Sequence, residues 1–307
     1  MSTYSPQPKI SIITCFLNVE QYLEEAIASV LAQHYAHWEL LLVDDGSTDG
    51  STRTAKKYAE LWPNKIIYLE HPNHINKGAS ASRNVGLLKS QGELITFLDG
   101  DDVLLPTMLQ QQLELLQKQQ ATMVCEASEY WNDWDGLGKD NAIVPVGTEQ
   151  NRSYHPPELL FSLYPLGTGA APCLCGILVS REALLRHGGF EESFTGMYDD
   201  QTLLVKFYLH ESVYISSACH NRYRQRAGSL VHTSHHHGNY LQERFTFLTW
   251  FDRYLKNQGI ADPKIKAVLK ANFKKLQDNR RQHKRSMTLA AIKRVLKPYV
   301  WWRKTGR

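Results

Sequence analysis

Short apolar segments alternate with amphipathic ones through the first 127 residues, and this alternation limits the fold more than any other feature. Each apolar segment is five to seven residues long and rich in Ile, Leu or Val, as buried strands are. Between these segments, apolar residues recur at helical spacing, as at Val19, Leu23 and Ile27. Strands separated by helices of this length predict an α/β fold with a mostly parallel sheet and right-handed crossovers. The five predicted strands are residues 9–15, 38–43, 65–69, 94–98 and 123–127.

The remainder of the chain has a less regular pattern. Residues 131–172 are rich in Trp, Gly, Asn and Pro, which predicts loops over a site with one short helix near residues 157–163. A further strand is predicted at residues 174–180 and a helix at residues 200–209. The pattern after these elements is helical only. We therefore predict one α/β domain over residues 1–235, followed by a helical, basic C-terminal extension over residues 236–307.

Charge is divided unevenly along the chain. Residues 262–307 hold 15 Lys and Arg against two Asp, a net charge of +13, which leaves −9 for residues 1–261 of the overall +4. Residues 287–302 also interleave Leu, Val and Trp with Lys and Arg, which suits an anionic bilayer interface. We therefore predict peripheral contact of residues 264–307 with an anionic membrane surface. Packing of this segment on the body or on a second subunit is the alternative. No nucleic-acid partner is expected, because no binding motif accompanies the charge.

Neither a membrane span nor a signal peptide is predicted. No apolar run approaches the roughly 18 residues that span a bilayer. The polar segment at residues 1–9 lacks the hydrophobic core of a signal peptide. The five cysteines are odd in number, and the spacing of Cys173 and Cys175 is that of neither a CxxC motif nor a zinc site. These features predict a cytoplasmic protein, with the inner face of the membrane as the place of any peripheral contact.

Three acidic clusters stand where predicted strands end or a predicted helix begins. Asp44 and Asp45 follow the second strand, Asp99 and Asp101 follow the fourth, and Asp200 opens a later helix. The ends of parallel strands meet at one edge of a sheet, where ligands bind. A turn or a helix cap is the alternative, because Asp favours both. Adjacent carboxylates repel one another unless a cation is bound, so Asp99 and Asp101 predict a Mg²⁺ or Mn²⁺ site.

Six segments, taken in chain order, resemble the family 2 glycosyltransferases. Each is a weak signal alone, but their ordered set is specific to that family. The resemblance covers residues 9–226 and implies the family's GT-A (Rossmann-like) fold. The segments are SIITCFLN at 11–18, VDDGSTD at 43–49, NKGASASRNVG at 76–86, FLDGDD at 97–102, the acceptor-side CGILVSRE at 175–182 with GGFE at 188–191, and YDD at 198–200.

The resemblance implies an inverting transfer of a sugar from a nucleotide-sugar, a UDP-sugar above all, to a glycan or lipid-linked acceptor. Synthesis of polysaccharide, glycolipid or cell-surface glycan is the implied setting. It assigns Mg²⁺ or Mn²⁺ to Asp99 and Asp101, the general base to Asp200, and contact with the nucleotide base to either Asp44 or Asp45. The implied nucleotide-sugar-binding residues are Cys15, Leu17, Asp44, Asp45, Arg83 beside the base, Asp99, Gly100 and Asp101.

The chain departs from the family pattern at three positions. Cys15 and Leu17 stand where the family usually has Pro and Tyr, and Asp199 stands where it usually has Glu. Leu17 offers no aromatic face to the base, whereas Cys15 is expected to act through its backbone. Arg224 lies in a segment that often follows the general base in this family and is predicted to contact diphosphate. The two tryptophans within residues 130–136 either contact the acceptor or pack against the domain.

Two other functions are less consistent with the sequence than a glycosyltransferase. A nucleotidylyltransferase would need a Gly-rich phosphate loop after the first strand, where this chain has residues 14–18 without glycine. A non-catalytic nucleotide-binding or membrane-scaffold protein would not need Asp99, Asp101 and Asp200 together. Both alternatives are therefore disfavoured.

Overall fold

The structure is a computed structural model that divides into two compact units, residues 1–236 and residues 237–307. The domain boundary predicted after residue 235 lies outside the described residues. The described residues are 5, 7–226 and 240–281.

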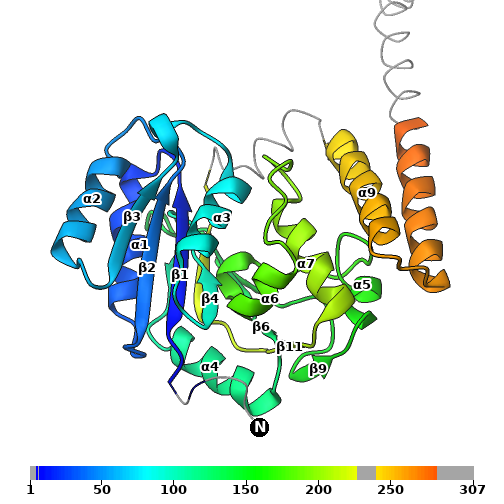
Figure 1. The fold of residues 1–307 in the computed structure, drawn as a ribbon, viewed down its shortest axis with the longest axis horizontal. Coiled ribbons are helices and arrows are strands. Elements are labelled where there is room, and N and C mark those ends of the chain that lie inside the picture. Colours follow the sequence, from blue (N-terminus) through cyan, green and yellow to red (C-terminus); the bar gives the residue numbers. More distant parts are fainter. Residues whose placement is uncertain (1–4, 6, 227–239, 282–307) are drawn as a thin grey trace, which may run out of the picture. The chain divides into compact units, whose positions relative to one another are not determined.

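A twisted sheet of eight strands runs through the first unit (Figure 1). Its strands are β1 (Ile10–Phe16), β2 (Trp38–Asp44), β3 (Ile66–Glu70), β4 (Leu94–Phe97), β6 (Met123–Cys125), β9 (Arg152–Tyr154), β10 (Ile177–Ser180) and β11 (Val213–Ile215). Their order across the sheet is β3-β2-β1-β4-β10-β6-β11-β9. The first four are parallel to one another, and β6 is parallel to β11, whereas β10 and β9 run antiparallel to their neighbours. The predicted mostly parallel sheet is confirmed.

Helices cover both faces of this sheet, because alternate side chains of its buried strands point to opposite sides. On one face, Ile12 of β1 belongs to a core shared with α1 (Glu20–Leu31), α2 (Ser51–Leu61) and α4 (Met108–Gln119). On the other face, Ile13 packs against Gly86 of α3 (Ala79–Lys89), where a Cβ atom would lie only 2.5 Å from Ile13 Cγ2. Figure 1 shows α1 and α3 on opposite sides of β1.

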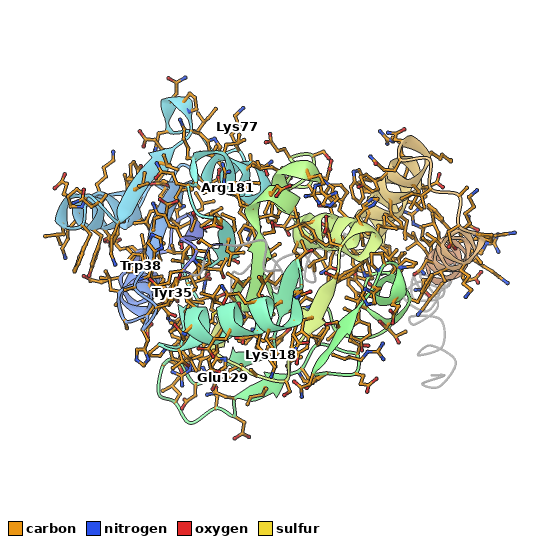
Figure 2. The ribbon with its side chains drawn as sticks, turned by 60° about the horizontal axis from the view of Figure 1, so that its bottom comes forward. Tyr35, Trp38, Lys77, Lys118, Glu129 and Arg181 are labelled. Atoms are coloured by element: carbon orange, nitrogen blue, oxygen red, sulfur yellow. The ribbon has the colours of Figure 1, made fainter. Side chains whose placement is uncertain are left out.

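The end of β2 remote from the predicted site is closed by aromatic residues. Tyr35 and Trp38, both labelled in Figure 2, are buried at the amino end of this strand. The Tyr35 hydroxyl donates a hydrogen bond of 2.6 Å to the carbonyl of Pro8. The acidic residues of the predicted site lie at the other, carboxyl end of the parallel strands.

The prediction of loops for residues 131–172 is wrong in part, because this region contributes to a smaller, second sheet. This sheet consists of β5 (Val103–Leu104), β12 (Asn221–Arg224), β7 (Ser128–Trp131) and β8 (Ala142–Val144), in that order. Two of its strands and β9 have only two or three residues, too few for an alternating pattern to appear in the sequence. The predicted strand at residues 174–180 is also shorter, since residues 174–176 form a 3₁₀ turn before β10.

Three helices complete the first unit among its described residues, and the last of them carries the predicted base. They are α5 (Glu158–Ser162), α6 (Arg181–Arg186) and α7 (Asp199–His210). The short predicted helix near residue 160 corresponds to α5, and the helix predicted at residues 200–209 corresponds to α7.

The second unit is helical in its described part. It contains α9 (Tyr240–Asn257) and a helix over residues 263–281. The two are joined by a 2.7 Å hydrogen bond from Arg244 to Asn272 and a 3.0 Å bond from Arg280 to Gln242. The amphipathic segment predicted at residues 287–302 lies outside the described residues. Among the helices that are described, none is long and apolar enough to cross a membrane.

Candidate active site

A pocket of about 530 Å³ opens where β1, β2 and β4 end. Phe16 closes β1, Asp45 follows β2 and Asp99 follows β4, and all three line this pocket. The sequence prediction that these strand ends meet is therefore correct. The predicted site residues that line the pocket are Cys15, Leu17, Asp45, Arg83, Asp99, Gly100, Asp101 and Asp200.

Asp44 is the predicted site residue that does not line the pocket. Its carboxylate is fully buried and accepts hydrogen bonds from the Ser47 backbone N–H at 2.8 Å and the Thr52 hydroxyl at 2.6 Å. It therefore holds the loop after β2. The neighbouring Asp45 presents its carboxylate to the pocket and accepts backbone N–H bonds from Lys77 at 2.8 Å and Gly78 at 3.0 Å.

Glycine is required in this loop. Gly46 has a φ of +85°, and a Cβ atom there would lie 2.8 Å from the backbone nitrogen of Asn76. Gly100 serves a second close approach, since a Cβ atom there would lie 2.8 Å from Phe16 Cβ. Both glycines allow neighbouring backbone segments to converge at the strand ends.

Arg83 connects two acidic clusters. Its buried guanidinium donates a 2.7 Å bond to Asp99 Oδ1 and a 2.6 Å bond to Asp199 Oδ2, and its side chain is 6% exposed. Asp99 follows β4 and Asp199 begins α7, so Arg83 links the two elements that carry the predicted metal ligands and the predicted base. Arg83 thus lines the pocket with its charge already shared between two carboxylates.

Cys15 also contacts Asp99. Its Sγ donates a 3.7 Å hydrogen bond to Asp99 Oδ1. Burial raises the pKa of the Cys15 thiol to about 12, which keeps it neutral and unreactive near pH 7. The Cys15 side chain is thus a neutral neighbour of the acidic cluster.

Two arginines at the end of β12 contact the loop of Asp101 and Asp102. Arg226 Nε donates a 2.6 Å bond to Asp101 Oδ2, and Arg226 lines the pocket. Arg224 is buried and donates from Nε to the Asp101 carbonyl at 2.6 Å and from its backbone N–H to Asp102 at 2.9 Å. Arg224 was predicted to contact diphosphate, but it does not line the pocket and instead bonds the loop of Asp101 and Asp102. Arg226, which the sequence prediction missed, lines the pocket together with the predicted Arg83.

Aromatic rings surround the Arg224 guanidinium. Its central carbon lies 4.3 Å from the ring centroid of Trp131 and 5.4 Å from that of Trp134, and Tyr22 lies on another side at 4.9 Å. The Trp134 indole donates to the carbonyl of Gln225 at 2.9 Å. Neither tryptophan lines the pocket, so the packing alternative describes their place in this structure.

Asp200 lies in the first turn of α7. Its carboxylate accepts 2.7 Å and 3.0 Å hydrogen bonds from the backbone and side-chain nitrogens of Gln201. Burial, with a further contribution from the charge of Asp199, raises the pKa of Asp200 to about 7. A carboxyl group with this pKa can take up a proton near neutral pH.

Tyrosine side chains form another part of the pocket wall. Tyr130 and Tyr223 meet edge to face with their ring centroids 5.2 Å apart, and both line the pocket. Tyr164 and Tyr198 stack at 5.8 Å and share a hydroxyl–hydroxyl hydrogen bond. The sequence contained no spacing signal for these four residues, because they come from four separate segments.

The carboxylates at the end of β4 fit a divalent cation that also binds the substrate. In the described part of the chain, no three His, Cys, Asp or Glu side chains form a complete metal site. Asp99 and Asp101 both line the pocket, and burial together with the charge of Asp99 raises the pKa of Asp101 despite Arg226. Mg²⁺ commonly binds one or two carboxylates and completes its coordination with substrate phosphates and water. These residues therefore suit such a cation.

Comparison with known proteins identifies the family. Residues 11–185 match the family described as Glycosyl transferase family 2. The chain belongs to this family. The resemblance predicted from the ordered motifs is confirmed.

Several named relatives align with this glycosyltransferase. It is 38% identical over 265 residues to the cholesterol galactosyltransferase of Borreliella burgdorferi, covering 82% of this chain and 69% of the relative. It is 32% identical over 177 residues to the putative teichuronic acid biosynthesis glycosyltransferase TuaG of Bacillus subtilis, covering 57% of this chain and 64% of TuaG. It is 42% identical over 111 residues to the putative glycosyltransferase EpsE of Bacillus subtilis, covering 36% of this chain and 39% of EpsE.

A solved structure has the same fold. S. aureus TarS residues 1–349 in complex with UDP-GlcNAc align with a TM-score of 0.54 at 21% identity, covering 72% of this chain and 60% of that one. The predicted GT-A fold is confirmed by this likeness and by the sheet order.

Arg83 provides a test of how the acidic clusters are held. We expect Arg83→Met to lower the free energy of unfolding by about 3 kcal/mol, because two carboxylates lose their shared buried partner. This value is at the low end of the range for breaking a buried ion pair, because the Asp99 side chain is 38% exposed. Urea denaturation measures the change. Arg53→Met is the matched control: that side chain is 83% exposed, so its change should stay below about 1 kcal/mol. Equal effects of the two variants would contradict the bridging role.

Proposed function

We propose that this glycosyltransferase moves a sugar from a nucleoside diphosphate to an acceptor hydroxyl in one inverting step, with Asp200 as the general base. The observation that carries the proposal is the position of Asp200 in one pocket with Asp99 and Asp101, together with its pKa of about 7. The S. aureus TarS complex with UDP-GlcNAc supports a UDP-sugar as the first donor to test.

Donor binding is assigned to the strand-end side of the pocket. Asp45 offers a carboxylate, fixed by two backbone N–H groups, to the nucleotide base. Asp99 and Asp101 would hold Mg²⁺ or Mn²⁺ against the diphosphate. That cation supplies neutralisation of the charge on the leaving nucleoside diphosphate. Arg226 stands next to Asp101 and offers a second positive charge to the same phosphates.

Asp200 is assigned the chemical step. Its carboxylate removes the proton of the acceptor hydroxyl as that oxygen forms a bond to the anomeric carbon. The bond from the anomeric carbon to the diphosphate oxygen breaks in the same step, and the diphosphate leaves with the bonding electrons. A single displacement inverts the anomeric configuration. Arg83 keeps the adjacent Asp199 paired, so that α7 holds Asp200 in place.

The acceptor is proposed to be a hydroxyl of a glycan or a lipid in cell-surface glycan or glycolipid synthesis. One relative is named for cholesterol and galactosyl transfer, and another for teichuronic acid biosynthesis. The tyrosine wall formed by Tyr130, Tyr164 and Tyr223 offers aromatic faces and hydroxyl groups, which suit a sugar ring or another apolar ring with a polar rim.

Asp200→Asn tests the assignment of the base. We expect the variant to lose at least about 10²-fold in turnover, in line with the usual contribution of a general base. Nucleotide affinity should be unchanged. A panel of UDP-, GDP- and dTDP-sugars with Mg²⁺ or Mn²⁺ first identifies the donor by turnover or thermal stabilisation. Near-normal turnover by Asp200→Asn would reject Asp200 as the base, and no turnover with any donor would reject the proposed function.

Asp101→Asn tests the cation site. The amide keeps the size of the side chain and removes its charge, so metal-dependent binding of a nucleoside diphosphate should weaken by about tenfold or more. Calorimetric titration with and without Mn²⁺ measures the effect. The matched control is Asp135→Asn, an exposed aspartate outside the pocket that should leave affinity unchanged. Unchanged affinity in Asp101→Asn would count against a cation at this carboxylate.

The pKa of Asp200 predicts two opposite pH responses. Only the ionised base accepts a proton, so kcat/KM should fall about tenfold per pH unit below pH 7 and level off above it. The folded-state pKa lies above the ordinary aspartate value of 3.8, so the cost of burying this charge appears as pH rises from about 4 to 7. Asp200→Asn should therefore raise Tm more at pH 8 than at pH 5. A pH-independent rate in this range, or equal Tm changes at both pH values, would contradict the assigned pKa.

A further inference from the structure

The helix over residues 263–281 in the second unit presents two different faces. Its buried residues are Ile265, Leu269, Asn272 and Leu276, which recur at intervals of three or four and form one stripe. Three exposed lysines, Lys266, Lys270 and Lys274, recur at intervals of four on the side away from that stripe. We call these three residues the lysine row. Figure 1 draws this helix in orange.

The lysine row lacks the acidic partners that most other surface cations have. Within the described residues, no Asp or Glu lies within 4 Å of any of the three ammonium groups. In the first unit, by contrast, exposed cations such as Lys57, Arg152 and Arg186 each pair with a glutamate. The second unit also has paired cations, Lys256 with Asp252 and Arg281 with Asp278, so the open charge is a property of the lysine row and not of the whole unit.

The geometry of the lysine row suits a flat anionic surface. An α-helix rises about 1.5 Å per residue, so the row extends about 12 Å along a straight line. Ala267 and Ala271 are exposed and flank the lysine row on one side, so the side chains along that flank are small. Residues 282–307 add eight Lys and Arg and no acid to the same end of the sequence.

We propose that the lysine row is a docking surface for the anionic headgroups of a phospholipid bilayer. Charge attraction of this kind holds a protein at the surface without insertion, and it is additive over a few lysines. The choice of a bilayer rests on the proposed function, because an acceptor carried by a lipid is met at a membrane. A nucleic acid is less suited, since Phe273, the aromatic residue of this helix, packs edge to face against Phe245 of α9 and is not free for base stacking.

Vesicle binding by the full chain tests the proposal. We compare Lys266→Gln/Lys270→Gln/Lys274→Gln with Lys57→Gln/Lys89→Gln/Lys118→Gln, which removes the same charge from exposed positions of the first unit. Lys118 is labelled on α4 in Figure 2. Vesicles of phosphatidylcholine, with or without one third phosphatidylglycerol, are sedimented at low and high salt. We expect the wild type and the control to bind only the anionic vesicles, and the lysine-row variant to bind about tenfold or more weakly.

The possible outcomes separate docking from catalysis. Equal weakening in both triple variants would show that only net charge matters and would overturn the proposal. Binding to a single-stranded oligonucleotide without binding to anionic vesicles would overturn it in favour of a nucleic-acid partner. The lysine-row variant should keep its circular dichroism spectrum and its rate of donor-sugar hydrolysis in solution. If the wild type hydrolysed no donor sugar, this would count against the proposed function and not against docking, because vesicle binding does not depend on turnover.

Discussion

The pocket depends on one buried cation. Arg83 bonds Asp99 after β4 and Asp199 at the start of α7, and these elements are far apart in the sequence. Without a shared positive charge, these two carboxylates would repel each other. The ion pairs thus fix the start of α7 relative to the end of β4. The distance between the donor side of the pocket and Asp200 follows from this geometry.

Much of the fold was predictable because its signals are local. The strands β1 to β4 were predicted within about one residue at each end, because each segment is apolar over most of its length and is bounded by polar residues. The small sheet was not predictable. β12 pairs in parallel with β7, and each has only four residues, so the pairing depends on contacts between distant segments. Nothing in either segment alone distinguishes such a strand from a loop.

The site was predicted as a set of clusters, but not residue by residue. Asp44 and Asp45 are adjacent in sequence, and only the three-dimensional path of the backbone decides which carboxylate faces the pocket. Arg224 and Arg226 pose the same problem, since both approach the Asp101 and Asp102 loop and one is enclosed by aromatic rings. Identical residue types in close succession carry no sequence signal for burial. Their roles come from tertiary packing.

The hydrogen bonds that hold Asp45 depend on the main chain of residues 77 and 78 and not on their side chains. The Asp45 carboxylate is held by the backbone N–H groups of residues 77 and 78, whereas the Lys77 side chain is exposed (Figure 2). Almost any amino acid at position 77 supplies the same donor, and only proline, which has no N–H, removes it. The side chain at position 77 can therefore change without loss of this hydrogen bond. Gly78 has no such freedom, because its φ of +91° favours glycine. The contact thus depends on the conformation of the main chain and not on the identity of the side chain at position 77.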